Sequence, residues 1–362
     1  MKKAIYPLSA DPIHNGHISN IERLLNLNLV DKLFIAIGKN YEKRTKYLFS
    51  DEEKLKITKK ALAIFKDRVE VEAFQGLLAH YAKKRSVDLI IRGCRHNSDF
   101  ENEQVIAEFN KAYNLTTLIL PAPKDTFSLS STMIKAITEN GGLTHEFVPP
   151  VIKQALEEKI LNITLIGVTG NTGAGKTSFC AKLAELNDNF FYIEVDKLIK
   201  KLYQENSEVR ENVKKSFGTN IYHKNEIDRK KLASIIFSDP VKRMGLVEIL
   251  RTPFKIALEE SIKNLNGLIL IDCAYLVEYN LMPLINNNII LLTCSDKTKQ
   301  KRNKEAKKIS EAQYSEKLLK ETIKKQQAIN NYGNFLEINT ERAIDYRSIA
   351  ERLKRFRILN TK

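Results

Sequence analysis

The sequence predicts two α/β domains, each built around a parallel β-sheet. Strand-like runs alternate with helix-like stretches along most of the chain, and strands separated by helices form parallel sheets with right-handed crossovers. At 362 residues the chain is longer than one compact core usually organises. A second cycle of strands and helices begins after a closing helix, so we expect one domain over residues 1–160 and another over 161–362.

Hydrophobic periodicity places the elements of the first domain. Apolar residues at helical spacing follow the first strand, from Ile18 to Leu25, and a closing helix is expected over 148–160. In parallel sheets ligands bind at the carboxyl ends of the strands, so the segments that follow the strands are candidate binding segments. The expected strands are residues 3–7, 32–38, 68–74, 87–93 and 115–121.

The second domain repeats this alternation of strands and helices. No Gly/Ser-rich or Pro-rich linker precedes it, which predicts that the two domains are closely joined. The biased segment that stands out is a basic run at 297–308. The expected strands lie near residues 163–168, 190–195, 267–272 and 288–293.

Composition argues against several classes of protein. Hydrophobic residues make up 43% of the chain, and no apolar run approaches the ~18 residues that cross a bilayer. The first residues lack the long apolar run and cleavage site of a secretory signal. Four distant cysteines form no CxxC pair, which argues against a zinc knuckle and a disulfide framework. We therefore expect a cytoplasmic protein that does not bind membranes.

The chain is strongly basic, with a formal net charge of +15. This charge favours anionic partners, and phosphorylated metabolites, acidic lipid and nucleic acid all fit it. Solvated lysine-rich faces are the alternative explanation. The charge alone does not choose between these.

A glycine-rich stretch, "GNTGAGKT", satisfies the phosphate-loop pattern, follows a strand and opens a helix. Its backbone N–H groups and the helix N-terminus favour a bound phosphate, whereas a plain glycine-rich turn is the alternative. Lys176 is expected to reach the β- and γ-phosphates of ATP, and Thr177 to ligate Mg²⁺. The stretch comprises Gly170, Asn171, Thr172, Gly173, Ala174, Gly175, Lys176 and Thr177.

Two aspartates are candidates for chemistry beside this loop. Asp196 is expected to end the strand "FFYIEVD", where a carboxylate suits a base that accepts the proton of an attacking hydroxyl. The alternative for Asp196 is a helix N-cap. Asp272 closes "GLILID" and is expected to position Mg²⁺ through water.

The second domain resembles dephospho-coenzyme A kinase, a P-loop kinase. The matching stretches are "GVTGNTGAGKT", "IEVD", the Phe217-Gly218 pair, "IDRKKLASIIFSDP" and "LIDCAYLVE", in the order of that family. The resemblance implies transfer of the ATP γ-phosphate to dephospho-coenzyme A, with Asp196 as base and Arg302 in a phosphate-covering lid. Thr252 and Ala274 replace a histidine and a proline of the family pattern.

The first domain contains a stretch whose function the local pattern does not decide, "YPLSADPIHNGH", with two histidines around an Asn-Gly pair. His14 and His17 in such a turn are compatible with a metal site, an ordinary turn or a nucleotide-binding loop. Two further stretches follow later strands, "IRGCRHNSDFENE" and "FSLSSTMIKA". They supply Arg92 and Arg95, which are forked donors suited to phosphate, and hydroxyl groups at a helix start.

Together these stretches resemble bacterial phosphopantetheine adenylyltransferase, a Rossmann-like nucleotidyltransferase of the T/HxGH group. The resemblance implies that His17 is catalytic and donates to the ATP α-phosphate, and that Ser9, Lys46 and Arg92 hold phosphopantetheine. Leu8 and Ala10 depart from the family's Gly and Phe. The implied ATP-binding residues are Ser9, His14, His17, Arg95, Glu103, Ser130, Ser131 and Thr132.

The two resemblances imply a fused transferase for the last two steps of coenzyme A biosynthesis, with Mg²⁺ as cofactor and ATP as co-substrate. The other substrates are 4′-phosphopantetheine and dephospho-coenzyme A, and the fusion is expected to raise the local concentration of the shared intermediate. Nucleic acid is not an expected partner, whereas self-association into a homo-oligomer stays open.

Three rival hypotheses remain at this point. A nicotinamide mononucleotide adenylyltransferase fused to a ribosylnicotinamide kinase has the same domain order. A degenerate kinase domain that senses nucleotide or coenzyme A accommodates Thr252 and Ala274. The basic run at 297–308 suggests nucleic-acid binding, although it lacks interleaved aromatic residues.

Overall fold

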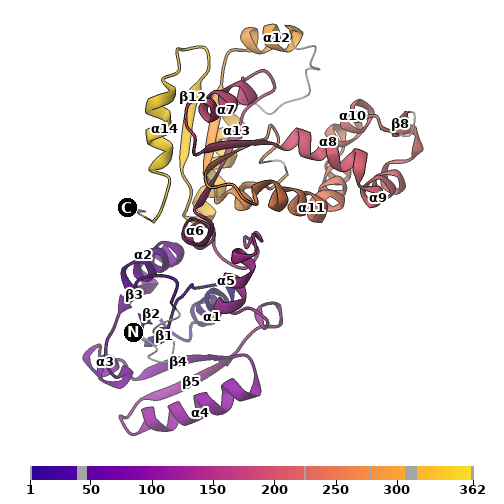
Figure 1. Ribbon diagram of the computed structural model, residues 1–362. Helices are drawn as coiled ribbons and strands as arrows, with labels where there is room; N and C mark the ends of the chain where they lie inside the picture. The colour runs from indigo at the N-terminus through magenta and orange to yellow at the C-terminus, as the bar shows by residue number, and fades with distance from the viewer. Residues whose placement is uncertain (1, 39–46, 224–225, 278, 306–315, 360–362) are drawn as a thin grey trace.

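Two five-stranded parallel sheets form the framework of the protein, one in each half of the chain (Figure 1). The computed structural model describes residues 2–38, 47–223, 226–277, 279–305 and 316–359. The fold class is therefore as predicted, an α/β chain with a parallel central sheet in each part. We call the parts built on the two sheets the first and the second domain.

The first sheet has the strand order β3-β2-β1-β4-β5. The chain leaves the central strand β1 in one direction for β2 and β3 and returns on the other side for β4 and β5, so the strand order reverses between β1 and β4, which is where parallel α/β sheets bind ligands. All five strands were predicted within a few residues. They are β1 (Lys3–Leu8), β2 (Lys32–Ile37), β3 (Val69–Ala73), β4 (Leu89–Cys94) and β5 (Thr116–Pro121).

Helices connect these strands and cover the sheet. Ser50 and Glu53 form a reciprocal capping box that starts α2, which explains why the helix begins directly after a turn. The helices are α1 (Asn15–Asn26), α2 (Asp51–Leu62), α3 (Leu78–Lys84), α4 (Asn97–Lys111) and α5 (Ser131–Glu139), with short 3₁₀ turns η2 (Ala63–Arg68) and η3 (Lys124–Thr126).

The second sheet has the order β12-β11-β6-β10-β7. Four of its strands match the predicted positions, whereas β12, a short edge strand with only one buried residue, was missed. The strands are β6 (Ile163–Thr169), β7 (Phe190–Glu194), β10 (Gly267–Asp272), β11 (Ile289–Thr293) and β12 (Phe335–Asn339). Around them lie α7 (Lys176–Glu185), α12 (Asp296–Glu305), α13 (Glu316–Asn330), α14 (Tyr346–Lys354) and the turn η6 (Met282–Ile285).

A group of helices projects from the second sheet and has a small apolar cluster of its own, which includes Tyr203, Val213 and Leu246 (Figure 1). We call this group the helical arm. It consists of α8 (Val195–Glu205), α9 (Ser207–Phe217), α10 (Arg229–Ser238) and α11 (Pro240–Ile262), with η5 (Thr219–Ile221) and the hairpin of β8 (Tyr222–His223) and β9 (Glu226–Ile227).

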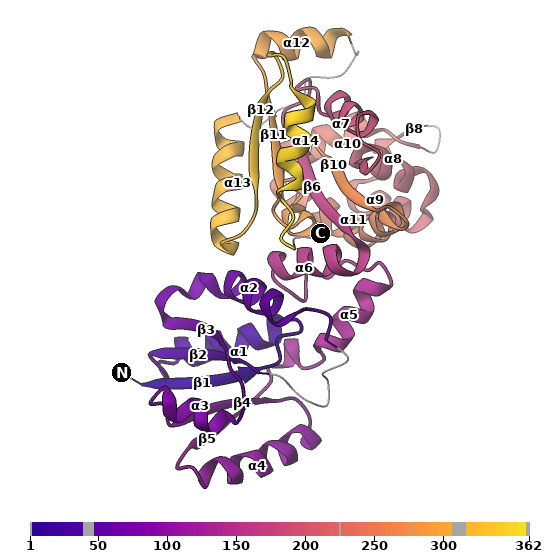
Figure 2. The same cartoon turned by 60° about the vertical axis from the view of Figure 1, so that its left-hand side comes forward.

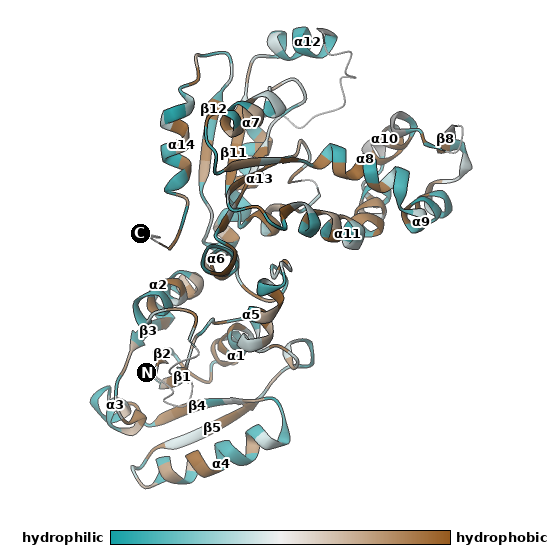
Figure 3. Ribbon diagram, viewed as in Figure 1, coloured by the Kyte–Doolittle hydropathy of each residue, from teal (hydrophilic) through white to brown (hydrophobic). Residues whose placement is uncertain are grey.

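The hydrophobic pattern explains the layers. Most of the central strands are hydrophobic, whereas the helices alternate hydrophobic and hydrophilic residues (Figure 3). β6 is buried along its whole length, as expected for a central parallel strand that is covered on both faces. Among the described residues, no helix is long and apolar enough to span a membrane.

The two domains meet at a buried polar seam formed by α6 (Pro150–Leu156) and the π-helical turn η4 (Glu157–Leu161) (Figure 2). The amide of Gln154 accepts from Asn288 at 2.9 Å and donates to the Phe356 carbonyl at 2.7 Å. The carboxylate of Glu158 accepts from the backbone N–H groups of Ile358 and Leu359. Pairing of this kind removes the cost of burying polar groups, so the seam is a fixed junction.

Each domain also contributes apolar side chains to the core of the other. Leu143, which precedes the seam, packs in the cluster around β6 and β10, while Ile358 and Leu359, near the end of the chain, pack in the cluster around β1 and α2. The division at residue 160 stays a prediction. The apolar contacts show that the cores of the two domains interlock on either side of this division.

We predict that Leu359→Ala destabilises the first domain although the residue lies at the far end of the sequence. Leu359 is 3% exposed within the first cluster, and truncating a buried leucine costs about 2–5 kcal/mol. Thermal unfolding should show a lower midpoint than in the wild type. Arg355→Ala, an exposed position a few residues earlier, is the control and should leave the midpoint unchanged; equal behaviour of the two variants would contradict the interlocked core.

Candidate active sites

The first candidate site lies where the three predicted segments meet at the carboxyl ends of β1, β4 and β5. The hydroxyl of Ser131 donates to the Pro12 carbonyl at 2.9 Å, which joins the start of α5 to the loop after β1. Arg95 donates to the Leu129 carbonyl at 2.8 Å, which joins the segment after β4 to the same region. Residues far apart in sequence are therefore direct neighbours near the point where the strand order reverses.

His14 and His17 are held by the backbone at the N-terminus of α1. Nδ1 of His14 accepts from the N–H of Gly16, and Nδ1 of His17 accepts from the N–H of His14, both at 3.2 Å. Since each Nδ1 is an acceptor, each neutral ring carries its proton on Nε2. The two rings stack with centroids 3.8 Å apart. The site thus offers two Nε2–H donors beside the positive end of a helix, which suits a phosphate.

The electrostatic surroundings keep both rings neutral. Burial, and then the guanidinium charge of Arg95, lower the pKa of His14 to about 4. Burial likewise lowers the pKa of His17 well below its ordinary value, with smaller effects of His14 and Arg95. At neutral pH the two imidazoles therefore act as uncharged donors, and the positive charge of the site resides on the arginines.

The two predicted arginines are placed differently. Arg92 forms a two-point ion pair with Glu103, whose carboxylate oxygens lie 2.5 and 2.7 Å from Nε and Nη2. This side-on pair leaves Nη1 of Arg92 outside the ion pair. Arg95 lies 3.8 Å from Asp99 in addition to its bond to Leu129. We had predicted separate roles for Arg92 and Glu103, but the structure brings them together.

A residue that sequence reasoning missed, Asp11, organises this region. Its buried carboxylate accepts from the N–H groups of Leu48 and Phe49 at 3.0–3.1 Å and from Lys135 at 2.8 Å. It therefore ties together the loop after β1, the segment that leads into α2, and α5. Its position in the "SADP" stretch was visible in the sequence, but its partners are 37 to 124 residues away.

The remaining predicted residues of this site occupy its rim. Ser9 directly follows β1 and is partly exposed, Ser130 caps α5 by accepting from Met133 N–H at 3.1 Å, and Thr132 is exposed in the first turn of α5. Ala10 is buried with a φ of 48°, an unusual backbone conformation for a residue with a side chain. Lys46 lies outside the described residues.

The second candidate site is the phosphate loop between β6 and α7. Gly170, Gly173 and Gly175 all have positive φ, and a Cβ on Gly170 would lie 2.3 Å from the Leu292 carbonyl oxygen. Glycine is thus required by both conformation and space. Lys176 begins α7 and its ammonium donates to the carbonyls of Gly170 and Asn171. The loop has the conformation and the cation that a triphosphate requires.

Thr177 and Asp272, the two residues predicted to serve Mg²⁺, are in direct contact. The Thr177 hydroxyl, in the first turn of α7, donates to Oδ2 of Asp272 at the end of β10 at 2.6 Å. Burial raises the pKa of Asp272, an effect opposed by the Thr177 hydrogen bond and the charge of Lys176. No group of three or more His, Cys, Asp or Glu side chains suited to a metal occurs among the described residues. A cation here would rely on Thr177, Asp272 and phosphate oxygens.

The predicted position of Asp196 requires a correction. We expected it to end a strand, but β7 ends at Glu194 and Asp196 lies in the first turn of α8, exposed to solvent. Helix formation begins earlier because Val195 packs into the core at the start of α8. Asp196 is still near enough for its charge to contribute to the raised pKa of Asp272, after the larger effect of burial.

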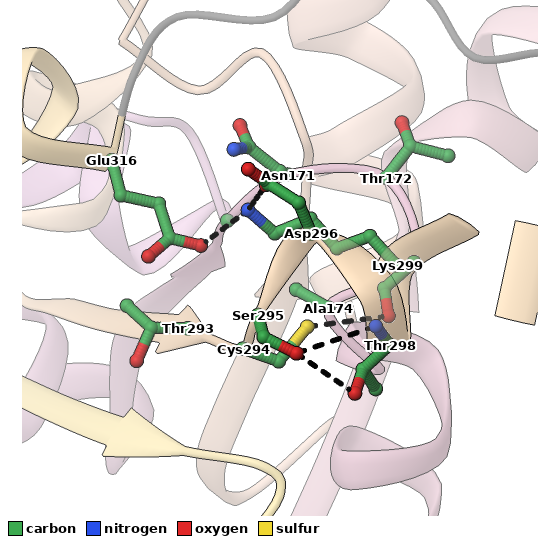
Figure 4. A network of polar contacts seen from close by, with 12 residues as sticks. Asn171, Thr172, Ala174, Thr293, Cys294, Ser295, Asp296, Thr298, Lys299 and Glu316 are labelled. Atoms are coloured by element: carbon green, nitrogen blue, oxygen red, sulfur yellow. Dashed lines mark hydrogen bonds and ion pairs between the residues drawn. The ribbon is translucent and has the colours of Figure 1, made fainter. Parts of the chain in front are cut away.

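The described part of the basic segment lies against the phosphate loop. Arg302, in α12, donates to the carbonyl of Gly173 at 3.2 Å and to the hydroxyl of Thr340 at 2.9 Å. Figure 4 shows Lys299 of the same helix between Asp296 and Glu316, at 3.1 and 2.8 Å. Thr340 follows the missed strand β12, which is why sequence reasoning did not find it. Residues 306–308 of the predicted basic run lie outside the described residues.

Comparisons with known proteins match both halves of the chain. A family model described as Cytidylyltransferase-like matches residues 5–137, and one described as Dephospho-CoA kinase matches residues 164–333. Phosphopantetheine adenylyltransferase from Pseudarthrobacter chlorophenolicus is 40% identical over 157 residues, which are 43% of this chain and 92% of the relative. The enzyme of that name from Caldanaerobacter subterraneus is 43% identical over 164 residues, covering 44% of this chain and 98% of the relative.

Solved structures are less similar. The crystal structure of TT1252 from Thermus thermophilus has 20% identity and a TM-score of 0.38, and covers 54% of this chain and 96% of that one. The structure of NadR protein in complex with NR has 12% identity and a TM-score of 0.35, with 100% and 97% covered. Similarity at this level carries no information about activity.

The fold and the two sites define a nucleotidyltransferase domain joined to a P-loop kinase domain. Within these classes, the chain belongs to the phosphopantetheine adenylyltransferase family through its N-terminal part and carries a dephospho-CoA kinase domain in its C-terminal part.

We predict that the neutral His14 makes the protein less stable in mild acid. Its pKa is about 4 in the folded protein and 6.5 in the unfolded chain, so below about pH 6.5 the unfolded state binds the extra proton. Stability should therefore fall as pH drops, by about 1–2 kcal/mol for this group between roughly pH 6.5 and 5.

The matched variant is His14→Asn, since asparagine also caps helices but does not titrate. Chemical denaturation at several pH values should give a shallower loss of stability for the variant. Parallel curves for variant and wild type would show that His14 is not held neutral.

Proposed function

We propose that this protein performs two consecutive transferase reactions, adenylyl transfer from ATP to 4′-phosphopantetheine and ATP-dependent 3′-phosphorylation of the resulting dephospho-coenzyme A. The observation that carries the proposal is that one chain holds two arrangements of donors that suit phosphate. One is the pair of Nε2–H donors at α1, and the other is the phosphate loop with Lys176. Family membership of both parts supports it.

In the first reaction a phosphate oxygen of 4′-phosphopantetheine attacks the α-phosphorus of ATP. The bond between the α-phosphorus and the bridging oxygen breaks, and pyrophosphate leaves. The transition state carries additional negative charge, so uncharged donors and a helix N-terminus aimed at the phosphoryl oxygens stabilise it more than they stabilise the reactants. We assign this role to His17, assisted by His14.

Positioning of the two substrates falls to the rim of the first site. Arg92 and Ser9 would hold the phosphate of phosphopantetheine, together with Lys46. Arg95, Glu103 and the helix start at residues 130–132 would hold ATP. Because no covalent intermediate is needed, correct orientation of two anions accounts for much of the acceleration.

In the second reaction the ribose 3′-hydroxyl of dephospho-coenzyme A attacks the γ-phosphorus of a second ATP, and ADP leaves. We assign Asp196 as the base that receives the hydroxyl proton. The backbone of residues 170–175 would cradle the phosphates, and Lys176 and Arg302 would offset their charge. Thr177 and Asp272 are oxygen donors that suit Mg²⁺, which would supply charge neutralisation at the phosphates.

Two rival functions are disfavoured by specific observations. The relatives of the N-terminal part are phosphopantetheine adenylyltransferases at about 40% identity, which argues against a nicotinamide mononucleotide enzyme. In the basic segment, Lys299 is engaged in ion pairs and Arg302 in hydrogen bonds on the phosphate loop, which argues against a nucleic-acid surface. A degenerate sensing domain remains the alternative for the kinase part, because Thr252 and Ala274 depart from the family.

We further propose cytoplasmic localisation, where ATP and these substrates are found, and self-association into a homo-oligomer. The observation that favours self-association is the set of exposed apolar side chains on α4, namely Phe100, Val105 and Phe109. Neither membrane nor nucleic-acid partners are part of the proposal.

The decisive experiment is to incubate the purified protein with Mg-ATP and 4′-phosphopantetheine and to identify the products by mass. Coenzyme A is the expected product. Dephospho-coenzyme A alone would favour the sensing alternative for the kinase part. Neither product would overturn the proposed function.

Two variants should separate the reactions. His17→Ala is expected to lower the first reaction by ~10²-fold or more, and Lys176→Ala the second by a similar factor, since each removes a group that stabilises developing charge. Each variant is the control for the other, and both should remain folded. Loss of both reactions in either folded variant would show that the two sites are not independent.

A further inference from the structure

The segment from Leu143 to Phe147, which we call the bridging segment, touches the first active site on one side. Asn15 is the first residue of α1, directly after His14. Its backbone N–H donates to the Phe147 carbonyl at 2.9 Å, and its side-chain amide donates to the Glu146 carbonyl at 3.0 Å. The bridging segment therefore holds the end of α1 that carries both histidines.

On its other side the bridging segment is held by the second domain. Glu259, in the last turn of α11, accepts from the backbone N–H of Leu143 at 2.7 Å. Lys255, one turn earlier, lies 3.6 Å from the carboxylate of Glu146. The α11 helix thus contacts the bridging segment near each end of that segment. The contact at Leu143 is a charge-assisted hydrogen bond, and the contact at Glu146 is an ion pair.

Hydrophobic packing also holds the bridging segment against α11. Leu143 is 4% exposed and lies in the second domain's core with Leu258 and Ile262 of α11. Thr144 is also buried. Burial, followed by the charges of Lys153, Lys255 and Arg251, lowers the pKa of His145 to about 3, so no positive charge on the bridging segment opposes the cations of α11 at neutral pH.

We propose that Glu259 of the kinase domain is a positioning residue for the adenylyl transfer reaction, acting through the bridging segment on the N-terminus of α1. The chain of contacts runs from Glu259 to Leu143, along the bridging segment to Glu146 and Phe147, and from there to Asn15. Removing the carboxylate leaves the Leu143 N–H without this acceptor and loosens one end of the bridging segment, although Leu143 stays packed, so the start of α1 can shift. The inference rests on the proposed function of the first site.

Glu259 does not touch substrate in this scheme. Nor does it lie where α11 packs into the helical arm, because the α11 residues of the arm cluster, Leu246 and Leu250, are at least two turns earlier. The kinase reaction should therefore be nearly insensitive to its loss. This difference between the two reactions in one polypeptide provides an internal control.

The test compares Glu259→Ala, Glu259→Gln and Glu260→Ala, the last being an exposed carboxylate at the neighbouring position of α11. Pyrophosphate release with ATP and 4′-phosphopantetheine measures the first reaction, and ADP release with added dephospho-coenzyme A measures the second. We expect Glu259→Ala to lower kcat of the first reaction on the order of 10-fold, because small displacements of catalytic groups have large effects. KM for 4′-phosphopantetheine should change little, since the arginines stay in place.

Glu259→Gln keeps an acceptor oxygen for the Leu143 N–H and should restore most of the rate, and Glu260→Ala should match the wild type. Hydrogen exchange of the backbone over residues 14–18 should be faster in Glu259→Ala than in Glu260→Ala. An unchanged first reaction, or an equal fall of both reactions with a lower unfolding temperature, would overturn the proposal. A wild-type protein without the first activity would instead overturn the proposed function.

Discussion

Parallel β-structure imposes the constraint on which both sites depend. When every strand of a sheet runs in the same direction, all carboxyl ends meet at one edge, and the helices that follow begin there with unpaired N–H groups and a positive dipole. The first site uses the N-termini of α1 and α5 in this way, and the second uses that of α7. Such an edge favours phosphate ligands. Adenylyl transfer and phosphorylation can therefore both use helix N-termini at the carboxyl edge of a parallel sheet.

In the first site, hydrogen bonds to two histidine rings add to the effect of the helix N-termini. Backbone N–H groups of its own turn hold both imidazoles by Nδ1, which fixes the proton on Nε2. Burial keeps the rings neutral, so they serve as donors without adding charge that would bind reactants and transition state alike. Charge is supplied instead by Arg92 and Arg95, one paired with Glu103 and the other near Asp99.

The junction of the two domains is unlike a flexible tether. It contains buried side chains from α6 and η4 whose polar atoms are bonded to residues at the amino ends of β11 and β12 and beyond α14. The carboxyl edge of the second sheet, with the phosphate loop, lies at the opposite end of these five-residue strands, about 16 Å away. The junction at the amino edge is therefore remote from the phosphate loop, while the cores of the two domains interlock there.

The fold and most of the first site could be predicted from the sequence, because local patterns carry that information. Hydrophobic alternation placed nine strands, and the phosphate loop and the "PIHNGH" turn were recognisable because each needs glycine or cap residues at fixed spacing. Edge strand β12 escaped because its pattern is short and only partly buried. The end of β7 was misplaced because tertiary packing of Val195 determines where α8 begins.

The sequence by itself thus determined the elements, their order and the residue types at each strand end. Only the tertiary structure decided which of them meet. The Arg92–Glu103 pair, the Asp11 anchor, Thr340 beneath Arg302 and the Glu259–Leu143 contact all join residues from different elements. No local pattern encodes such contacts, because they depend on how helices pack on the sheets and on how one domain packs against the other.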